Sequence, residues 1–303
     1  MQVDTCSREA GDEERMEIPF VEFFAGIGGF SCAVEHLPVN VVAAFDQDAA
    51  ARATYEAHFG TVTAIDLCGL RRADPEVLAA DGWWLSPPCQ PYTAKGRQLD
   101  VADPRARPLL HLINRLPDYR PSYLLLENVP PFATSRSRQL LLDTLQALGM
   151  KTQEAFICPT DFGIPNRRNR YFLLASQNAI APPPPYPRFE TSLGDYLEPS
   201  RPQQYLPPEL AGRLDPASNI VAVDGVPAVF GSSYGRAIHG SGSYFDDGQG
   251  IRRFTPQEIL RMLHFPATFR LPSALRQRAQ YKLAGNSVNV AVVRYLVEWL
   301  LGT

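Results

Sequence analysis

The 303-residue chain lacks the features that mark several protein classes. Its five cysteines are an odd number without CxxC spacing, which argues against a disulfide framework or a structural zinc site. Its five histidines show no metal-ligand spacing, so we expect no metal. No apolar run approaches 18 residues, and the acidic N-terminus is unlike a secretory signal. We therefore expect a soluble protein of a reducing compartment, cytoplasmic or also nuclear in a eukaryote, with no membrane contact and no obligate protein partner.

An excess of positive charge is also missing, since the formal net charge is −3. This counts mildly against a nucleic-acid binder. Residues 1–17 hold six acids and two bases, a net charge of −4, so the rest of the chain sums to +1. We interpret residues 1–17 as a disordered acidic tail, and a nearly neutral body can still present a basic face.

What the sequence does contain is an alternation of apolar strands and helices after residue 17. It predicts strands at 18–24, 39–45, 62–65, 83–85, 123–126, 152–157 and 171–175, and helices at 30–37, 48–59, 109–116 and 139–148. Such alternation is typical of a parallel α/β sheet with helices on both faces. Ligands bind such open sheets at the carboxyl ends of the strands.

The composition of the sequence changes at Ala181, which is followed by four consecutive prolines, Pro182 to Pro185. Residues 181–254 are rich in Gly, Ser and Tyr, with short β-like pieces at 220–223 and 227–230, and predict a small irregular domain. Thr255-Pro256-Gln257-Glu258 predicts a helix start, and residues 289–301 an amphipathic helix. We thus expect one domain formed by residues 18–180 and 255–303, with 181–254 as a second.

A glycine-rich turn, Ala25-Gly26-Ile27-Gly28-Gly29, lies between the first predicted strand and helix. Its glycines let a ligand approach the backbone, and N–H groups at a helix start favour an anionic group. Asp46, 17 residues past Gly29, ends the next strand, where a carboxylate can bind two ribose hydroxyls. The spacing is not GxGxxG, which favours a single adenosine-type cofactor whose adenine edge Asp66-Leu67 could hold. The alternative is a plain tight turn.

A second motif, Ser86-Pro87-Pro88-Cys89-Gln90-Pro91-Tyr92, follows the predicted strand 83–85. Two prolines make the loop rigid and fix the next side chain outward. Cys89 is therefore a candidate nucleophile, whereas the remaining cysteines fit the ordinary role of buried small hydrophobes.

Two charged clusters complete the candidate site. Glu127-Asn128 follows the apolar strand 123–126, where a partly desolvated carboxyl group can serve as an acid. Arg168 and Arg170 alternate at a strand start, so both can face one phosphate, base carbonyl or carboxylate. A mere turn and a solvated basic edge are the simpler interpretations of these two clusters.

Together the clusters predict one reaction. The Cys89 thiolate adds to C6 of a cytosine while Glu127 donates a proton or hydrogen bond at N3. C5 of the resulting enamine takes a methyl group, a base removes the C5 proton, and Cys89 leaves. We expect Arg168 or Arg170 to help lower the pKa of the thiol. The target base must leave its stack to be reached.

These motifs resemble, in their order along the chain, those of the cytosine-C5 DNA methyltransferases. The matching segments are Phe24–Gly29, Pro87–Gln90, Glu127–Val129, Arg168–Arg170 and Gly285–Val288. The resemblance covers about residues 18–303 and implies a Rossmann-like S-adenosylmethionine-dependent methyltransferase domain with a small irregular target-recognition domain. It implies Cys89, Glu127, Arg168 and Arg170 as catalytic residues. The cofactor residues it implies are Phe24, Ile27, Gly28, Gly29, Asp46, Gln47, Asp66, Leu67, Ser86, Asn286 and Ser287.

Within this family, one branch methylates cytosine-38 in the anticodon loop of tRNA(Asp). Gly96-Arg97-Gln98, Asp103-Pro104-Arg105, Ser233-Tyr234-Gly235 and Gly240–Ser243 resemble it, although Val229-Phe230-Gly231 stands where that branch has Cys-Phe-Thr. The resemblance implies tRNA in preference to DNA. The nucleic-acid contacts that we expect are Arg97, Tyr234, Arg236 and Ser243. Arg136, Arg138, Arg252 and Arg253 are further candidates for phosphate contacts, or are simply solvated charges.

Two alternatives stay open. A small DNA cytosine-C5 methyltransferase would share every catalytic motif, and residues 181–254 would then read DNA. A non-catalytic nucleic-acid binder could keep the same fold, although an intact Cys89, Glu127 and Arg168 argue against it. A nicotinamide oxidoreductase fits neither the glycine spacing nor the Pro-Pro-Cys loop.

Overall fold

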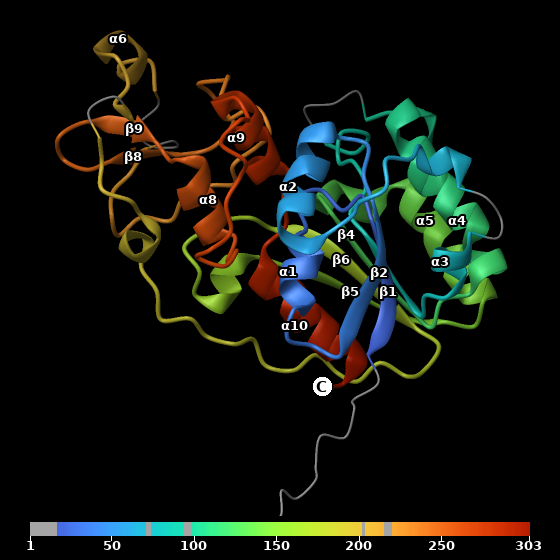
Figure 1. Ribbon diagram of the computed structural model, residues 1–303. Coiled ribbons are helices and arrows are strands. Elements are labelled where there is room, and N and C mark those ends of the chain that lie inside the picture. The colour runs from blue at the N-terminus through green and yellow to red at the C-terminus, as the bar shows by residue number, and fades with distance from the viewer. Residues whose placement is uncertain (1–16, 71–73, 94–97, 202–203, 215–219) are drawn as a thin grey trace, which may run out of the picture.

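Figure 1 presents the computed structural model, which describes residues 17–70, 74–93, 98–201, 204–214 and 220–303. The predicted disordered tail lies outside the described residues except for Glu17, and so does Arg97. Within the described ranges, we find no helix both long enough and apolar enough to span a membrane.

A six-stranded sheet forms the centre of the larger part of the molecule. Its strands lie in the order β2-β1-β3-β4-β6-β5. Their bounds are β1 Ile18–Phe23, β2 Val39–Phe45, β3 Gly82–Leu85, β4 Tyr123–Asn128, β5 Lys151–Ile157 and β6 Arg170–Ser176. Strands β1 to β4 pair in parallel, whereas β6 runs antiparallel to both β4 and β5.

The reversal of β6 corrects the prediction of a wholly parallel sheet. The segment between β5 and β6 holds only the short 3₁₀ turn η5 (Pro159–Phe162) and no crossover helix. As a result the amino end of β6 lies at the same sheet edge as the carboxyl ends of β1, β3 and β4. Arg168 and Arg170 reach the candidate site in this way, although they precede or begin their strand.

Helices cover both faces of the sheet (Figure 1). One side carries α1 (Gly29–Val34), α2 (Ala49–Phe59) and α10 (Val290–Leu301), and the other α3 (Pro75–Leu78), α4 (Arg107–Tyr119) and α5 (Arg136–Ala147). Strand alternation sends successive side chains to opposite faces. Trp84 stacks on Phe30 of α1 with ring centroids 5.1 Å apart, whereas Trp83 meets Phe23 on the other face at 4.9 Å. This double coverage is why β1, β3 and β4 consist mainly of apolar residues.

Side-chain caps fix where several helices begin. Asp48 accepts hydrogen bonds from the amides of Ala50 and Ala51 at the start of α2, as Asn289 does from Val292 at α10. The predicted start of α8 (Pro256–Met262) is confirmed, since Thr255 and Glu258 form a capping box. Two further α-helices of the described residues are α6 (Pro208–Ala211) and α9 (Gln277–Asn286). Further 3₁₀ turns are η1 (Leu67–Gly69), η2 (Asp100–Ala102), η3 (Pro104–Ala106), η4 (Pro130–Thr134) and η6 (Leu193–Tyr196).

The predicted strand at 62–65 is wrong. Thr63 alone pairs with Phe45 at the open edge of β2, through amide hydrogen bonds to Ala44 and from Asp46. Thr61, Thr63 and Ala64 are exposed, and Val62 is buried in a small cluster with Ala44 and Tyr55, so the segment is anchored by one apolar residue and a single bridge rather than by a strand.

The smaller part of the molecule is a lobe around a three-stranded sheet in the order β7-β8-β9. Its strands are β7 (Ile220–Val221), β8 (Tyr244–Asp246) and β9 (Ile251–Arg253), and they lie beside α8 in Figure 1. The predicted β-like piece at 227–230 makes only one bridge, between Ala228 and Arg167. The proline-rich segment that leads to the lobe is held against α10, because Tyr295 donates to the Pro184 carbonyl at 2.7 Å.

Candidate active site

The glycine-rich turn after β1 is fixed by a carboxylate from the neighbouring strand. Asp46, just past β2, accepts hydrogen bonds from the amides of Gly26 and Asp48, each at 2.7 Å. Gly28 has φ +87° and an added Cβ would lie 2.3 Å from the Phe59 ring. Phe24 itself has φ +57°, a strained conformation for a side chain of its size. The strand order and the glycines thus build a sharp turn that a bulkier sequence could not form.

Burial raises the pKa of Asp46, while its amide hydrogen bonds from Asp48 and Gly26 oppose that shift. The carboxylate is only half-buried, so its oxygens, which each keep a second lone pair, stay available to a ligand. Asp46 therefore holds the glycine-rich turn in place and also presents oxygen atoms that can bind a ligand.

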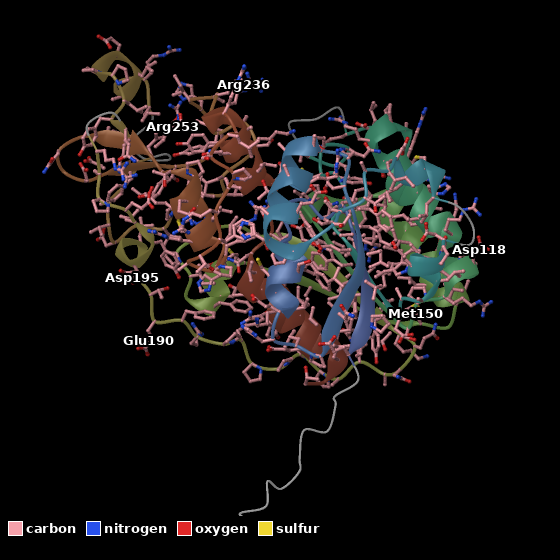
Figure 2. All side chains as sticks on the ribbon, viewed as in Figure 1. Asp118, Met150, Glu190, Asp195, Arg236 and Arg253 are labelled. Carbon is pink, nitrogen blue, oxygen red and sulfur yellow. The ribbon has the colours of Figure 1, made fainter. Side chains whose placement is uncertain are left out.

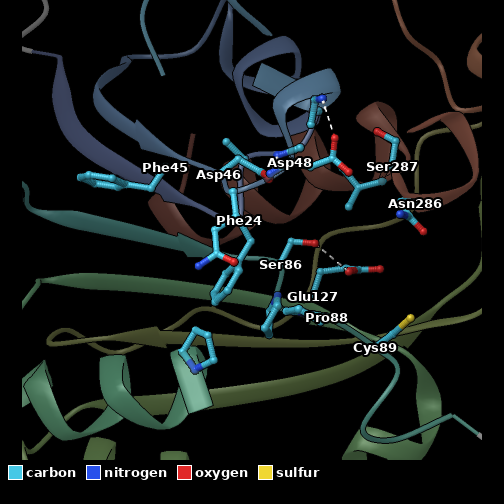
Figure 3. Close-up of a pocket in the computed structure, with 18 of the residues that line it drawn as sticks. Phe24, Phe45, Asp46, Asp48, Ser86, Pro88, Cys89, Glu127, Asn286 and Ser287 are labelled. Carbon is cyan, nitrogen blue, oxygen red and sulfur yellow. Dashed lines mark hydrogen bonds between the residues drawn. The ribbon is translucent and has the colours of Figure 1, made fainter. Parts of the chain in front are cut away.

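A cavity of about 780 Å³ opens at this edge of the sheet (Figure 3). All predicted cofactor residues except Gly28 line it: Phe24, Ile27, Gly29, Asp46, Gln47, Asp66, Leu67, Ser86, Asn286 and Ser287. The four predicted catalytic residues, Cys89, Glu127, Arg168 and Arg170, line the same cavity. Segments that are far apart in the sequence are therefore brought together as the motifs predict. Gly28 belongs to the turn but faces the Phe59 ring instead of the cavity.

The Cys89 loop is held by hydrogen bonds on both of its sides. Asn128 at the end of β4 donates its side-chain amide to the Pro87 carbonyl at 3.2 Å. The amides of Tyr92 and Thr93 donate to the Cys89 carbonyl at 3.0 and 3.1 Å. The Tyr92 ring packs edge-on against Phe132 at 4.8 Å, and its hydroxyl donates to Ser137. The cysteine thus lies on a stiff turn at the cavity wall, as the two prolines predict.

Glu127 is oriented by two neighbours. Ser86 donates its hydroxyl to Oε2 at 3.1 Å, and the Arg170 Nε lies 3.1 Å from Oε1. Figure 3 shows the Ser86–Glu127 hydrogen bond beside Pro88 and Cys89. Because both carboxyl oxygens are held, the side chain presents a fixed orientation to any molecule in the cavity.

Arg168, two residues before β6, is buried and joins this segment to the end of α9. Its guanidinium donates to the backbone carbonyls of Ser287 and, at 3.4 Å, of Gly285. Burial lowers the pKa of Arg168 to about 9, with Arg170 adding to the shift, so the group keeps its charge at neutral pH. Its Nε finds no protein partner. Arg168 thus fixes the Gly285–Ser287 segment against the catalytic strands and leaves one donor free.

Two opposing effects set the pKa of the Cys89 thiol. Burial raises it, and the Glu127 charge raises it further, while Arg170 and Arg168 act in the expected downward direction. Burial outweighs the arginines, so the free protein holds Cys89 as a thiol and not as a preformed thiolate. Formation of the nucleophile then depends on what enters the cavity.

A family model described as C-5 cytosine-specific DNA methylase matches residues 18–208 and 230–301. The chain belongs to this family. Enzymes of this family use S-adenosylmethionine as methyl donor.

The chain is 29% identical to the tRNA (cytosine(38)-C(5))-methyltransferase of Spodoptera frugiperda, covering 94% of this chain and 99% of that protein. It is 27% identical to a DNA (cytosine-5)-methyltransferase of Dictyostelium discoideum, over 94% of each chain. The solved structure of the Entamoeba histolytica methyltransferase EhMeth superposes with a TM-score of 0.86 at 28% identity, covering 94% and 98% of the two chains.

The lobe of this methylase does not present all of the predicted nucleic-acid contacts. Tyr234 and Ser243 are buried, and the Tyr234 hydroxyl donates to the Ser243 carbonyl at 2.5 Å and accepts from the Phe254 amide at 3.0 Å. The prediction that Tyr234 and Ser243 touch nucleic acid is therefore wrong for this conformation. Arg236 is exposed at the outer surface of the lobe (Figure 2), and Arg97 lies outside the described residues.

Two of the phosphate candidates are also bound within the protein. Arg252 is fully buried and makes two hydrogen bonds to Glu258, at 2.8 and 2.9 Å, so it is not a phosphate contact. Arg138 is paired with Glu154 at 2.6 Å on the face of β5. The buried Arg252–Glu258 pair joins β9 to α8, whereas Arg138 and Glu154 form a partly exposed pair between α5 and β5.

Sequence reasoning missed several residues that line the cavity of the methylase. Glu22 lies within β1, and Asp48, which lines the cavity, pairs with Lys282 of α9 at 2.6 Å. Arg105 also lines the cavity and is held by Asp103. Glu22 had a signal, since it is the only charged residue among the apolar residues of β1. Asp48 and Lys282 are 234 residues apart, so no local sequence pattern could indicate that they pair.

Proposed function

We propose that this methylase transfers the methyl group of S-adenosylmethionine to C5 of cytosine-38 in a tRNA anticodon loop. The observation that carries the proposal is that Cys89, Glu127, Arg168 and Arg170 line one cavity with the proposed cofactor residues. The relative from Spodoptera frugiperda, which matches nearly end to end, is named for this reaction.

The cavity suits the cofactor in size and in the chemistry of its walls. A volume of about 780 Å³ lies in the range of small-molecule sites. Phe24, Ile65 and Leu67 offer apolar surface for an adenine ring, while the Asp46 carboxylate can accept ribose hydroxyls. When bound, S-adenosylmethionine supplies the electrophilic methyl group. The residues that would hold it are Phe24, Ile27, Gly29, Asp46, Gln47, Asp66, Leu67, Ser86, Asn286 and Ser287.

Cys89 is the proposed nucleophile. Its sulfur forms a bond to C6 of the cytosine, and the electron pair of the C5–C6 bond moves onto C5 and N3. After C5 has taken the methyl group, a base removes the C5 proton, the double bond returns, and the sulfur leaves as thiolate. Arg170 and Arg168 act to lower the pKa of the thiol. They therefore stabilise the thiolate both when it attacks C6 in the first step and when it leaves in the last.

Glu127 is the proposed acid at N3. It lies with Cys89 in the cavity wall, and both of its oxygens accept, from Arg170 and from Ser86. It therefore acts as an acid with a proton that it first receives, and the Cys89 thiol, which loses its proton when the sulfur adds to C6, is the proposed source. A hydrogen bond or proton at N3 disperses the negative charge that thiolate addition pushes into the ring. Ser86 holds the other oxygen, so the carboxyl group needs no reorganisation when the base arrives.

Residues 181–254 are the proposed target-recognition domain. A base in a single-stranded loop is not held in a duplex, which lowers the free energy needed to bring a cytosine into the cavity. Arg236 gives this lobe positive charge at its exposed surface (Figure 2), whereas Arg253 is half-buried with its guanidinium 5.6 Å from the Tyr244 ring centroid. DNA is the second candidate substrate, favoured by the description of the family model and by the Dictyostelium relative.

Methyl transfer from labelled S-adenosylmethionine tests the function. Total small RNA and unmethylated duplex DNA are compared as acceptors, using the wild type, Cys89→Ala and Cys32→Ala. We expect label in RNA from the wild type and from Cys32→Ala, and a loss of about 10⁴-fold or more in Cys89→Ala. Cys32 is a suitable control because its thiol is buried in α1.

The other outcomes separate the alternatives. Label only in DNA would make the protein a DNA methyltransferase and residues 181–254 a DNA-reading domain. No label in either acceptor would favour a nucleic-acid-binding protein that kept the fold. Full activity of Cys89→Ala would refute the covalent step while leaving the substrate assignment intact.

A further inference from the structure

The loop that carries Cys89 is tied to helix α5 by side chains outside the cavity. Tyr92, three residues after the cysteine, donates its hydroxyl to Ser137 of α5 at 3.0 Å. The Ser137 hydroxyl in turn donates to the Asp100 carboxylate at 2.7 Å. Tyr92 and Ser137 are buried, and neither Ser137 nor Asp100 lines the cavity. The three side chains thus form one hydrogen-bonded chain that begins in the cysteine loop and ends outside the cavity wall.

Asp100 is the residue on which these bonds converge. Besides the Ser137 hydroxyl, its carboxylate accepts from the amides of Arg136 and Ser137 in the first turn of α5. Its own amide donates to the Pro91 carbonyl at 3.3 Å. A carboxylate suits a helix start, where amides lack intrahelical partners and the helix dipole is positive. Asp100 therefore holds the cysteine loop with its backbone and α5 with its side chain.

The backbone next to these bonds is strained. Asp100 has φ +48° and Gln98 has φ +49°, both in the left-handed region that residues with side chains rarely adopt. Such conformations persist where surrounding contacts fix them, and they occur often at functional sites. The start of α5 does not need this strain, because Ser135 already caps the helix by accepting from the Arg138 amide. The contacts of Asp100 therefore serve the cysteine loop and not the helix alone.

The position of Cys89 depends on these bonds. The amide of Tyr92 donates to the Cys89 carbonyl at 3.0 Å, so a shift of Tyr92 moves the cysteine with it. Resting on the proposed function, we propose that Asp100 and Ser137 are positioning residues, which hold the Cys89 turn against α5 so that the sulfur is aligned with C6 of the cytosine. Neither residue touches the reacting atoms. A misplacement of about 1 Å can slow a reaction about 10²-fold, so bonds outside the cavity can still set the rate of turnover.

Two other thiols separate positioning from general stability. Cys32 is buried in α1, so its alkylation reports loss of the fold. Cys68 is exposed and lines the same cavity, so its alkylation reports access of the reagent. Burial raises the pKa of the Cys89 thiol, which protects it from alkylation. Release of the turn from α5 would expose Cys89 and speed its alkylation alone, whereas a general loss of stability would also expose Cys32.

The test compares Ser137→Ala and Asp100→Asn with the wild type, using iodoacetamide at pH 7 and mass spectrometry of each cysteine. Ser137→Ala removes the hydroxyl that donates to Asp100 and leaves the cysteine loop itself unchanged, while Asp100→Asn removes the carboxylate charge. We expect alkylation of Cys89 to become about threefold faster or more in both variants, with Cys68 and Cys32 unchanged. Methyl transfer to the acceptor that the wild type uses should fall about 10- to 100-fold in kcat, with an unchanged KM for S-adenosylmethionine.

Thr144→Ala and Asp143→Asn are the matched controls, because both residues lie on α5 and bond only within that helix in the contacts described. Thr144 donates to the Leu140 carbonyl, and Asp143 accepts from the Gln139 side chain. Both control variants should match the wild type in the alkylation of Cys89 and in turnover.

In an active wild type, the proposal stands only if Ser137→Ala combines faster alkylation of Cys89 with slower turnover. Wild-type values of either quantity would overturn it, as would alkylation of Cys32 and Cys89 rising in step, since Ser137 would then only stabilise the fold. If Asp100→Asn does not fold, Ser137→Ala alone decides. A wild type that methylates neither RNA nor DNA would refute the proposed function, and the alkylation rates alone would then decide whether these bonds position Cys89.

Discussion

At the sheet edge Cys89, Glu127 and Arg170 line a cavity, whereas in the smaller lobe Arg252 and Tyr234 are buried and bonded to neighbouring residues. Both regions are rich in charged and hydroxyl side chains, and the sequence motifs of both resemble the same family. The comparison teaches that a motif residue contacts substrate only where the backbone leaves a cavity beside it. In the lobe these residues are enclosed by a buried aromatic cluster that includes Phe230, Tyr244 and Phe254, so they contact protein and not solvent.

The two regions should therefore respond to substitution in opposite ways. Changes at the sheet edge should lower the rate of methyl transfer and leave the free energy of unfolding nearly unchanged. Changes at buried polar residues of the lobe should lower the free energy of unfolding first, and activity only as a consequence.

The largest effect is expected for Glu127→Gln. The amide keeps the shape of the side chain but cannot donate a proton at N3, so turnover should fall by about 10²- to 10⁴-fold. Glu154→Gln is the matched control, because Glu154 is also paired with an arginine but lies outside the cavity. Single-turnover methyl transfer to tRNA measures the effect, and urea unfolding checks stability. Unchanged turnover in Glu127→Gln would show that Glu127 is not the acid.

The next effect is expected for Arg252→Ala in the lobe. The substitution leaves Glu258 buried without its cation, which should cost about 3–5 kcal/mol of the free energy of unfolding. Arg213→Ala, an exposed arginine of the same lobe, should change it by about 0.5 kcal/mol or less. Urea denaturation of both variants measures the difference. Equal stability of Arg252→Ala and the wild type would contradict the structural role of this ion pair.

The two regions also differ in how far the sequence predicted them. At the sheet edge the glycine turn, the Pro-Pro-Cys loop and Glu127 are local patterns, because each sits at a strand end that apolar residues mark. Parallel pairing then brings these ends together, so their convergence on one cavity was predictable. The direction of β6 was not, because it depends on whether the chain between β5 and β6 forms a crossover helix.

In the lobe the local sequence patterns were too weak to predict where the strands lie and which side chains are buried. Its strands are two or three residues long, and its order comes from contacts such as Tyr234 with Tyr281 of α9, with ring centroids 5.4 Å apart. A tyrosine among glycines and serines predicts a stacking surface equally well whether it faces solvent or the interior. Burial, which decides between these, is set by residues distant in sequence.

A smaller loss of stability is expected for Tyr234→Phe. Removing the hydroxyl leaves the Phe254 amide and the Ser243 carbonyl buried without this partner, at a cost of about 1–3 kcal/mol. Tyr186→Phe is the control, since its side chain is 39% exposed and water can replace any contact of its hydroxyl. Thermal and urea unfolding report the effect. A Tyr234→Phe protein of wild-type stability that binds tRNA less tightly would instead restore Tyr234 as a contact residue.

The smallest effect is expected for Arg236→Ala, at the exposed surface of the same lobe (Figure 2). If Arg236 contacts one phosphate, tRNA affinity should fall by less than about tenfold, and the slope of log affinity against log salt should decrease by about 1. The free energy of unfolding should not change, because the side chain is exposed. Filter binding over a series of salt concentrations measures the slope. Tyr234 and Arg236 are two residues apart, so opposite responses at these positions would show that burial, not the motif, decides which residue reads the substrate. A loss of stability in Arg236→Ala would break that distinction.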